Sequence, residues 1–209
     1  MDFFTVPTLT FGVLYSFFVI AHDRRRILHW NVTRHPTAAW VFQQLREAFP
    51  YDSAPRYLIF DREHTFQGEV LETAKSLGVK PIRIAIRSPW QNGVAERFVG
   101  SCRRDLFDHV IVLNERQMKR LMTEYVRYYH DDRTHLGLAK STPSGRKAWN
   151  NPDPHRKVVS MPRLGGLHHR YDLAAWLVVP NSRPSKFEVA GREIRVRKKQ
   201  RRVFWGSRR

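Results

Sequence analysis

The chain has 209 residues, of which 37 are Lys or Arg and 19 are Asp or Glu, so its formal net charge is +18. Hydrophobic residues make up 42% of the sequence, which is enough for a packed core and argues against a fully disordered basic chain. The pI of about 10.9 favours a polyanionic partner, with nucleic acid ahead of an anionic membrane surface.

The positive charge is divided between two parts of the chain. Residues 181–209 contain 11 basic and 2 acidic residues, a net of +9, and residues 1–180 contain 26 and 17, also a net of +9. The basic tail is either an arm that binds DNA or a solvated end. We expect it to be mostly disordered.

Cysteine content and the apolar start of the chain exclude several classes of protein. Cys102 is the single cysteine, so an intrachain disulfide and a cysteine-based zinc finger are both excluded. The first twenty residues lack a basic n-region and contain Pro7, which makes a poor signal peptide. The apolar run over residues 11–21 is too short to span a bilayer. We therefore expect a cytoplasmic protein, with Cys102 as a small buried residue.

The sequence begins with three predicted strands, over residues 3–6, 11–20 and 28–33. The second is an almost continuous aromatic and β-branched run, which is typical of a strand buried on both faces. The third alternates apolar and polar residues, as in a strand with one wetter face. Because short turns separate them, we expect an antiparallel meander.

Helices and strands alternate after this meander. The expected order is a helix over 41–49, a strand over 57–60, a helix over 70–77 ended by Gly78, a strand over 82–86, and helices from 91 past 104 and from Asn114 to 129. This order predicts an α/β fold with a mixed five-stranded sheet flanked by helices. We expect a core domain over residues 1–150, a loop-rich closing segment over 151–180 and a basic tail over 181–209.

Three carboxylates stand out because acidic residues are scarce in this chain. Asp2 lies at the start of the first predicted strand, Asp61 follows the strongly apolar fourth strand, and Glu96 lies in the helix after the fifth. Binding sites in α/β proteins gather at the carboxyl ends of strands, and converging carboxylates bind hard divalent cations. Two such cations about 4 Å apart can support phosphoryl transfer. Taken singly, each of these acids is better interpreted as a turn or cap residue.

Three segments of the chain, residues 2–8, 58–62 and 88–97, resemble the acidic blocks of the DDE integrase/transposase core. Retroviral integrases and many bacterial insertion-sequence transposases share this core. The third block is the most specific, because Pro-x-Gln-Asn-Gly followed by Glu four residues after Asn rarely occurs by chance. Weaker matches lie at residues 128–136, 142–143 and 165–171, so the resemblance covers roughly residues 2–171.

The resemblance implies a ribonuclease H-like fold and a metal-binding catalytic triad of Asp2, Asp61 and Glu96. Thirty-four residues separate Asp61 from Glu96, close to the spacing of the retroviral pattern. The implied cofactor is Mg²⁺ or Mn²⁺, with two ions expected. The implied activity is cleavage at transposon 3′ ends and strand transfer into target DNA, by a homo-multimer on the DNA of a bacterial cell.

Residues near the triad are candidate DNA contacts. Gln91 resembles the family's target-contact position. Asn92 is expected to position substrate or the catalytic Glu, or else to be a helix cap. Arg103 and Arg104 are candidate phosphate contacts, with solvated surface charge as the alternative.

A second set of residues has mainly structural interpretations. Arg133 and His135 match family positions, and we interpret them as structural pins. His168 and His169 lack a further ligand pattern, and Glu63, beside Asp61, is a weak competing metal ligand.

The chain departs from the family pattern at its start, where Asp2 follows Met1 directly. We therefore expect that the amino-terminal DNA-binding domain usual in this family is missing. Two alternatives to an active recombinase stay open: a truncated, non-catalytic DNA-binding remnant, and a structure-specific nuclease of the same fold.

Overall fold

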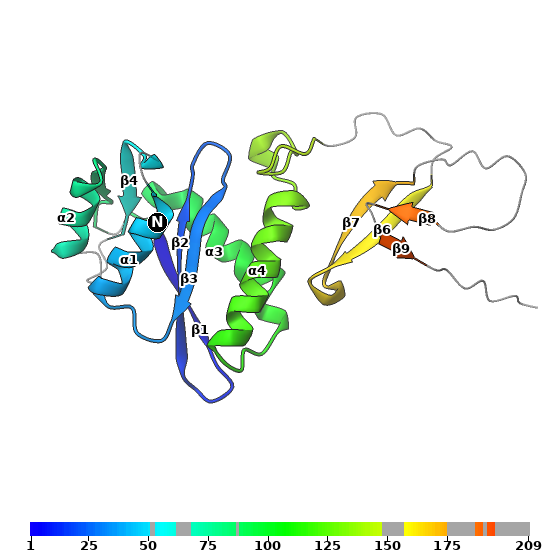
Figure 1. Ribbon diagram of the computed structural model, residues 1–209, viewed down its shortest axis with the longest axis horizontal. Coiled ribbons are helices and arrows are strands. Elements are labelled where there is room, and N and C mark those ends of the chain that lie inside the picture. The colour runs from blue at the N-terminus through cyan, green and yellow to red at the C-terminus, as the bar shows by residue number, and fades with distance from the viewer. Residues whose placement is uncertain are drawn as a thin grey trace, which may run out of the picture. The chain divides into compact units, whose positions relative to one another are not determined.

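The computed structural model describes most of the chain, and Figure 1 shows its helices and strands. The described residues are 1–50, 53–61, 68–86, 88–147 and 157–174, together with 187–189 and 192–194. The chain divides into two compact units, Met1–Ala174 and Ala175–Arg209. In the second unit, β8 (Phe187–Val189) pairs antiparallel with β9 (Arg192–Ile194). The rest of the basic tail lies outside the described residues.

The first three strands form the predicted antiparallel meander, in the order β1 (Asp2–Pro7), β2 (Val13–Ile20) and β3 (Ile27–Thr33). The second strand begins two residues later than expected, because Phe11 lies in the turn with φ of +59° and a 97% exposed side chain. The Thr8 hydroxyl closes this turn by accepting a hydrogen bond from the Gly12 N–H at 3.0 Å.

The next two strands, β4 (Tyr57–Phe60) and β5 (Lys80–Arg83), pair in parallel, with α2 (Glu69–Ser76) as the crossover between them. Gly78, with φ of +75°, follows α2 as predicted. The strand expected over 82–86 ends at Arg83, and Ile86 is 70% exposed. The cause is local, since the Ala85 N–H donates to the Gln91 side-chain oxygen at 2.7 Å and not to a neighbouring strand.

The five strands lie in two hydrogen-bonded sheets within the described part of the chain, one three-stranded and one two-stranded. The two sheets meet at the start of β1, where the Met1 amino group donates to the Ile59 carbonyl of β4 at 2.7 Å. A continuous five-stranded sheet therefore stays a prediction.

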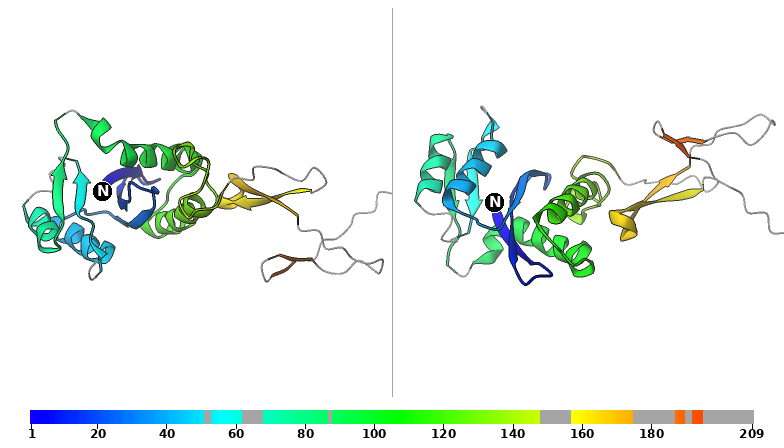
Figure 2. Two further views of the ribbon diagram at one scale, coloured as in Figure 1. Left: turned by 90° about the horizontal axis from the view of Figure 1, so that it is seen from above. Right: turned by 60° about the horizontal axis from the view of Figure 1, so that its bottom comes forward.

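Helices cover both faces of the first sheet (Figures 1 and 2). On one face, Phe17 and Val19 of β2 pack with α1 (Ala38–Ala48), α2 and β4. On the other face, alternate β2 residues such as Phe18 pack with α3 (Gly93–Asp105) and α4 (Glu115–Asp131). As predicted, α4 begins at Asn114, whose side chain accepts a hydrogen bond from the Gln117 N–H at 2.9 Å. The result is a sheet with helices in a layer on each side.

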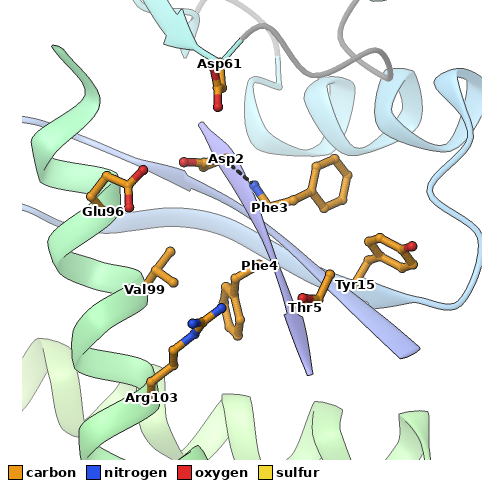
Figure 3. Close-up of a pocket in the computed structure, with 9 residues that line it drawn as sticks. All are labelled: Asp2, Phe3, Phe4, Thr5, Tyr15, Asp61, Glu96, Val99 and Arg103. Atoms are coloured by element: carbon orange, nitrogen blue, oxygen red, sulfur yellow. Dashed lines mark hydrogen bonds between the residues drawn. The ribbon is translucent and has the colours of Figure 1, made fainter. Parts of the chain in front are cut away.

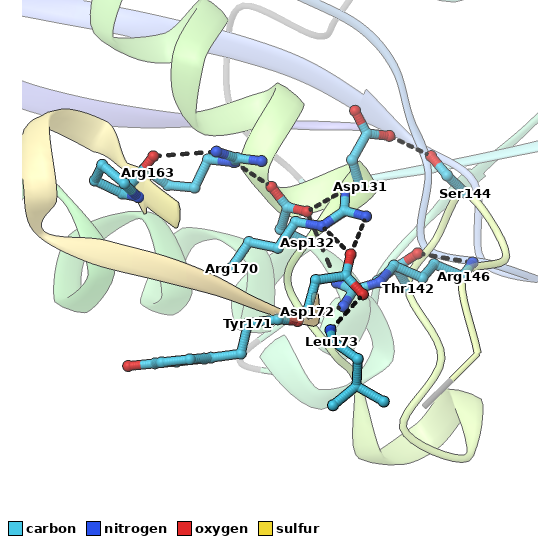
Figure 4. A network of polar contacts seen from close by, with 11 residues as sticks. Asp131, Asp132, Thr142, Ser144, Arg146, Arg163, Arg170, Tyr171, Asp172 and Leu173 are labelled. Carbon is cyan, nitrogen blue, oxygen red and sulfur yellow. Dashed lines mark hydrogen bonds and ion pairs between the residues drawn. The ribbon is translucent and has the colours of Figure 1, made fainter. Parts of the chain in front are cut away.

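Within the segment that we expected to be rich in loops, residues 158–173 form an antiparallel hairpin of β6 (Val158–Arg163) and β7 (His168–Leu173). Ion pairs to Asp132, at the end of α4, hold this hairpin (Figure 4). Its strands lack the apolar alternation that predicts a half-buried strand, so the sequence pattern does not reveal them.

The described residues include no helix that is long and apolar enough to cross a membrane.

Candidate active site

The three predicted carboxylates line one pocket with a volume of about 560 Å³. Figure 3 shows that Asp61 and Glu96 both point toward Asp2. The remaining wall is formed by β1, β2 and α3, through Phe3, Phe4, Thr5, Tyr15, Val99 and Arg103. Residues that are 59 and 35 positions apart in the sequence are thus brought to one place by the fold.

Each carboxylate occupies a defined position in its element. Asp2 is the first residue of β1 and pairs with Phe18 of β2. Asp61 directly follows β4, which the Met1 contact brings next to the start of β1. Glu96 lies in the first turn of α3, where the helix dipole favours a negative charge.

Electrostatic coupling joins the three acids. The pKa of Asp2 is raised from 3.8 to about 6, with burial as the largest cause and the negative charges of Glu96 and Asp61 as smaller causes in the same direction. The Phe3 N–H, which donates to Asp2 at 2.8 Å, and the amino terminus act in the opposite direction. Burial also lowers the pKa of the Met1 amino group to about 6. A cation in this pocket would relieve the repulsion that Asp2 experiences.

Asn92 contacts Asp2 directly, a role that the sequence does not specify. Its side chain is 1% exposed, and its Nδ2 donates to Asp2 Oδ2 at 3.1 Å. Its Oδ1 is buried without a hydrogen-bond partner among the described residues. We expected Asn92 to position Glu96 or substrate, or else to cap a helix; it occupies the N-cap position of α3 without a side-chain cap hydrogen bond, and its side chain contacts Asp2. Ninety positions separate the two residues, so no local pattern reports the contact.

The other candidate DNA contacts lie in different places. Arg103 lines the carboxylate pocket on the same face of α3 as Glu96. Arg104 lines a separate pocket with Arg97. Gln91 is exposed, and its side-chain oxygen is used by the Ala85 N–H. Of these residues, Arg103 alone joins the carboxylates in their pocket.

Sequence reasoning missed the aromatic side of this pocket. Phe3 and Tyr15 face each other across β1 and β2, with their ring centroids 6.4 Å apart, and both line the pocket. The Phe3 ring also stacks on Trp40 of α1 at 6.3 Å.

The donor chemistry of the pocket fits Mg²⁺ or Mn²⁺, because both prefer carboxylate oxygens. Across the described ranges, no group of three His, Cys, Asp or Glu side chains is drawn together tightly enough to hold an ion as it stands. Asp2, Asp61 and Glu96 therefore share a pocket without forming a closed ligand cluster. Glu63, the competing candidate, lies outside the described residues.

The residues that we interpreted as structural are hydrogen-bonded, stacked or buried inside the protein. Arg133 donates to Asp105 at 2.7 Å. His168 stacks on Tyr128 of α4, with ring centroids 4.7 Å apart. Cys102 is fully buried, as expected.

Part of the chain matches known proteins. Residues 77–143, which include Glu96 and all of α3 and α4, match the family model for the integrase core domain. The chain is also 27% identical over 127 residues to the putative transposase InsD for insertion element IS2E from Escherichia coli (strain K12). These two matches support the resemblance of the chain to a DDE-type transposase/integrase core. That relative's match covers 57% of this chain and 58% of the relative, so the chain spans somewhat more than half of the transposase.

The fold is similar to that of a solved structure. A chain of the simian T-cell lymphotropic virus intasome, solved in complex with PP2A regulatory subunit B56 gamma, is 11% identical with a TM-score of 0.55. The match covers 83% of this chain and 65% of that one. The catalytic core domain of BIV integrase is 18% identical with a TM-score of 0.44, covering 68% and 89%. The intasome similarity agrees with the ribonuclease H-like α/β fold that the sequence predicts.

Proposed function

We propose that this integrase core is a metal-dependent polynucleotidyl transferase that cleaves the 3′ ends of a mobile DNA element and joins them to target DNA. The observation that carries this proposal is the pocket in which Asp2, Asp61 and Glu96 face one another beside Arg103. The family match supports the class of reaction.

The residues of the pocket have separable roles in this proposal. Asp2, Asp61 and Glu96 hold one or two Mg²⁺ or Mn²⁺ ions. When bound, such ions activate the attacking oxygen and stabilise the leaving oxygen of the phosphoryl transfer. Arg103 provides a guanidinium that binds a DNA phosphate near the carboxylates. Asn92 holds Asp2 in place by its 3.1 Å hydrogen bond.

DNA is the proposed partner because the acidic pocket is set in a basic chain. Residues 1–180 carry a net charge of +9 despite the three carboxylates, and positive charge attracts the phosphate backbone. Two element ends must be joined together, so we propose that the chain acts as a homo-multimer on DNA. Gln91 and Arg104, together with the basic tail, are further proposed DNA contacts.

A disintegration assay on branched DNA tests the catalytic part of the proposal. With Mn²⁺ present, the parent chain resolves the branch by strand transfer, and Asp61→Asn lowers the rate by roughly 100-fold or more. The matched control is Asp108→Asn, which removes one exposed carboxylate outside the pocket and keeps the parent rate.

The two alternatives give different results in the same assay. A non-catalytic DNA-binding remnant shows salt-dependent binding and no metal-dependent product, with Asp61→Asn binding as the parent does. A nuclease of the same fold cuts the DNA in a carboxylate-dependent manner but joins no strands. Either result contradicts the proposed strand transfer.

A further inference from the structure

A second pocket, lined by basic residues, lies on another face of α3. It has a volume of about 520 Å³, and its lining includes four arginines, Arg25, Arg97, Arg104 and Arg133. Among the residues that the structure describes, no Asp or Glu lines it. The pocket is therefore strongly cationic, in contrast to the carboxylate pocket on the same helix.

The two pockets use neighbouring positions of α3. Glu96 and Arg103 line the carboxylate pocket, whereas Arg97 and Arg104 line the basic one. Successive helical residues are turned by about 100° from each other, so the two pairs face different directions. Arg97 and Arg104 are seven residues apart, about 10 Å along the helix axis. That span equals about three nucleotides of rise along one DNA strand.

Most of this positive charge is not neutralised by other described residues. Arg133 pairs with Asp105 at 2.7 Å, but Arg25, Arg97 and Arg104 form no ion pair with a carboxylate in the described part of the chain. His135, which is 4% exposed, forms part of the same lining. Burial, and then the charges of Arg133 and Arg25, lower the pKa of His135 to about 4. The imidazole is thus neutral at physiological pH, and the pocket's charge comes from guanidinium groups.

Guanidinium groups and an apolar edge together favour a phosphodiester backbone over a small free anion. Arg side chains bind phosphate oxygens through paired N–H groups. Leu136 lines the same pocket and is 87% exposed, so it offers an apolar contact for a deoxyribose. A free inorganic anion would gain nothing from that contact.

We propose that the basic pocket binds the DNA backbone, so that DNA contacts α3 on two faces, at the carboxylates and at Arg97 and Arg104. This inference rests on the proposed function, because it takes DNA as the partner. It adds a binding site that requires no metal and does not overlap the carboxylate pocket.

Binding of a short fluorescent DNA duplex in a metal-free, chelator-containing buffer tests the site. The double substitution Arg97→Gln and Arg104→Gln lowers affinity roughly tenfold, and the slope of log K against log salt becomes shallower by about two. The charge-matched control is Arg116→Gln with Arg120→Gln, two exposed arginines of α4 outside both pockets. Equal losses in the two double variants would mean that only diffuse charge acts, and would overturn the proposal.

Gly137→Ala tests the same pocket without changing charge. A Cβ at residue 137 would overlap the Arg25 guanidinium, which is the movable end of a long side chain. We expect Arg25 to be displaced, with several-fold weaker DNA binding and an unchanged melting temperature. Parent-like DNA binding by both Gly137→Ala and the Arg97/Arg104 variant would overturn the inference.

The outcomes separate this inference from the proposed function. If the parent binds DNA and carries out strand transfer, but the pocket variants bind DNA as tightly as the parent, only the inference about the basic pocket is refuted. If the pocket variants lose binding and the parent shows no metal-dependent product, the catalytic proposal alone fails. If the parent binds no DNA, both are refuted.

Discussion

The closing hairpin depends on one carboxylate, and Asp132→Asn tests that dependence. The Asp132 side chain is 4% exposed at the end of α4. It accepts hydrogen bonds from Arg163 at 2.5 Å and Arg170 at 3.3 Å, and it lies 3.8 Å from Arg146 (Figure 4). The substitution keeps the shape of the side chain and removes its charge. It leaves three guanidinium groups around a neutral amide.

The loss of unfolding free energy in Asp132→Asn depends on how exposed its three arginine partners are. The three arginine side chains are 27–33% exposed, so solvent screens part of each interaction. Hydrogen bonds to a charged group contribute about 1.5–3 kcal/mol each when well shielded, and the two here fall at the lower end. Because the amide oxygen of Asn can still accept hydrogen bonds, we expect the free energy of unfolding to fall by only about 2 kcal/mol. For a chain of this size the melting temperature falls by about 4–8 °C.

Urea unfolding followed by circular dichroism measures this loss, and hydrogen exchange localises it to β6 and β7. The matched control is Asp131→Asn, an exposed neighbour whose carboxylate accepts one hydrogen bond, from the Ser144 hydroxyl at 2.9 Å. A loss below about 0.5 kcal/mol for Asp132→Asn, within the range of ordinary surface substitutions, would refute the reasoning. So would an equal loss in the control, or unchanged exchange of the hairpin amides.

Three further predictions concern the core and the carboxylate pocket. Because burial raises the pKa of Asp2 to about 6, the folded chain keeps a proton that the unfolded chain loses between about pH 4 and 6. Over this range the parent therefore loses unfolding free energy as the pH rises, and Asp2→Asn becomes more stable relative to it. Urea unfolding midpoints measure this difference. Asn92→Ala removes the 3.1 Å hydrogen bond to Asp2 and weakens Mn²⁺ binding roughly 10-fold, measured by calorimetry. Phe98→Ala, at a ring 4.7 Å from Phe18, costs about 3–5 kcal/mol of unfolding free energy. Parent-like values in these measurements would contradict each prediction.

The sequence pattern predicted the structure at positions where neighbouring residues in the sequence determine it. The Asn114 cap places the start of α4, and Gly78 ends α2, because a capping side chain and a positive φ are properties of single positions. The placement of Asp61 after a buried strand follows from the apolar run before it. The acidic pocket could therefore be anticipated from three short segments and a family resemblance.

Long-range contacts were beyond sequence reasoning. The hairpin of β6 and β7 is held by charges to Asp132 and not by an apolar stripe, so its residues do not show a strand pattern. The contact of Asn92 with Asp2 spans 90 positions. In each case a partner distant in sequence decides the structure.

The central claim is that Asp2, Asp61 and Glu96 act together on a divalent cation. Titration of Mn²⁺ into the chain, followed by electron paramagnetic resonance of the free ion, tests it most directly. We expect saturable binding by the parent and by Asp108→Asn, and binding at least roughly 10-fold weaker for Asp61→Asn and for Glu96→Gln. Equal Mn²⁺ binding by all four proteins, or none by the parent, would contradict the account.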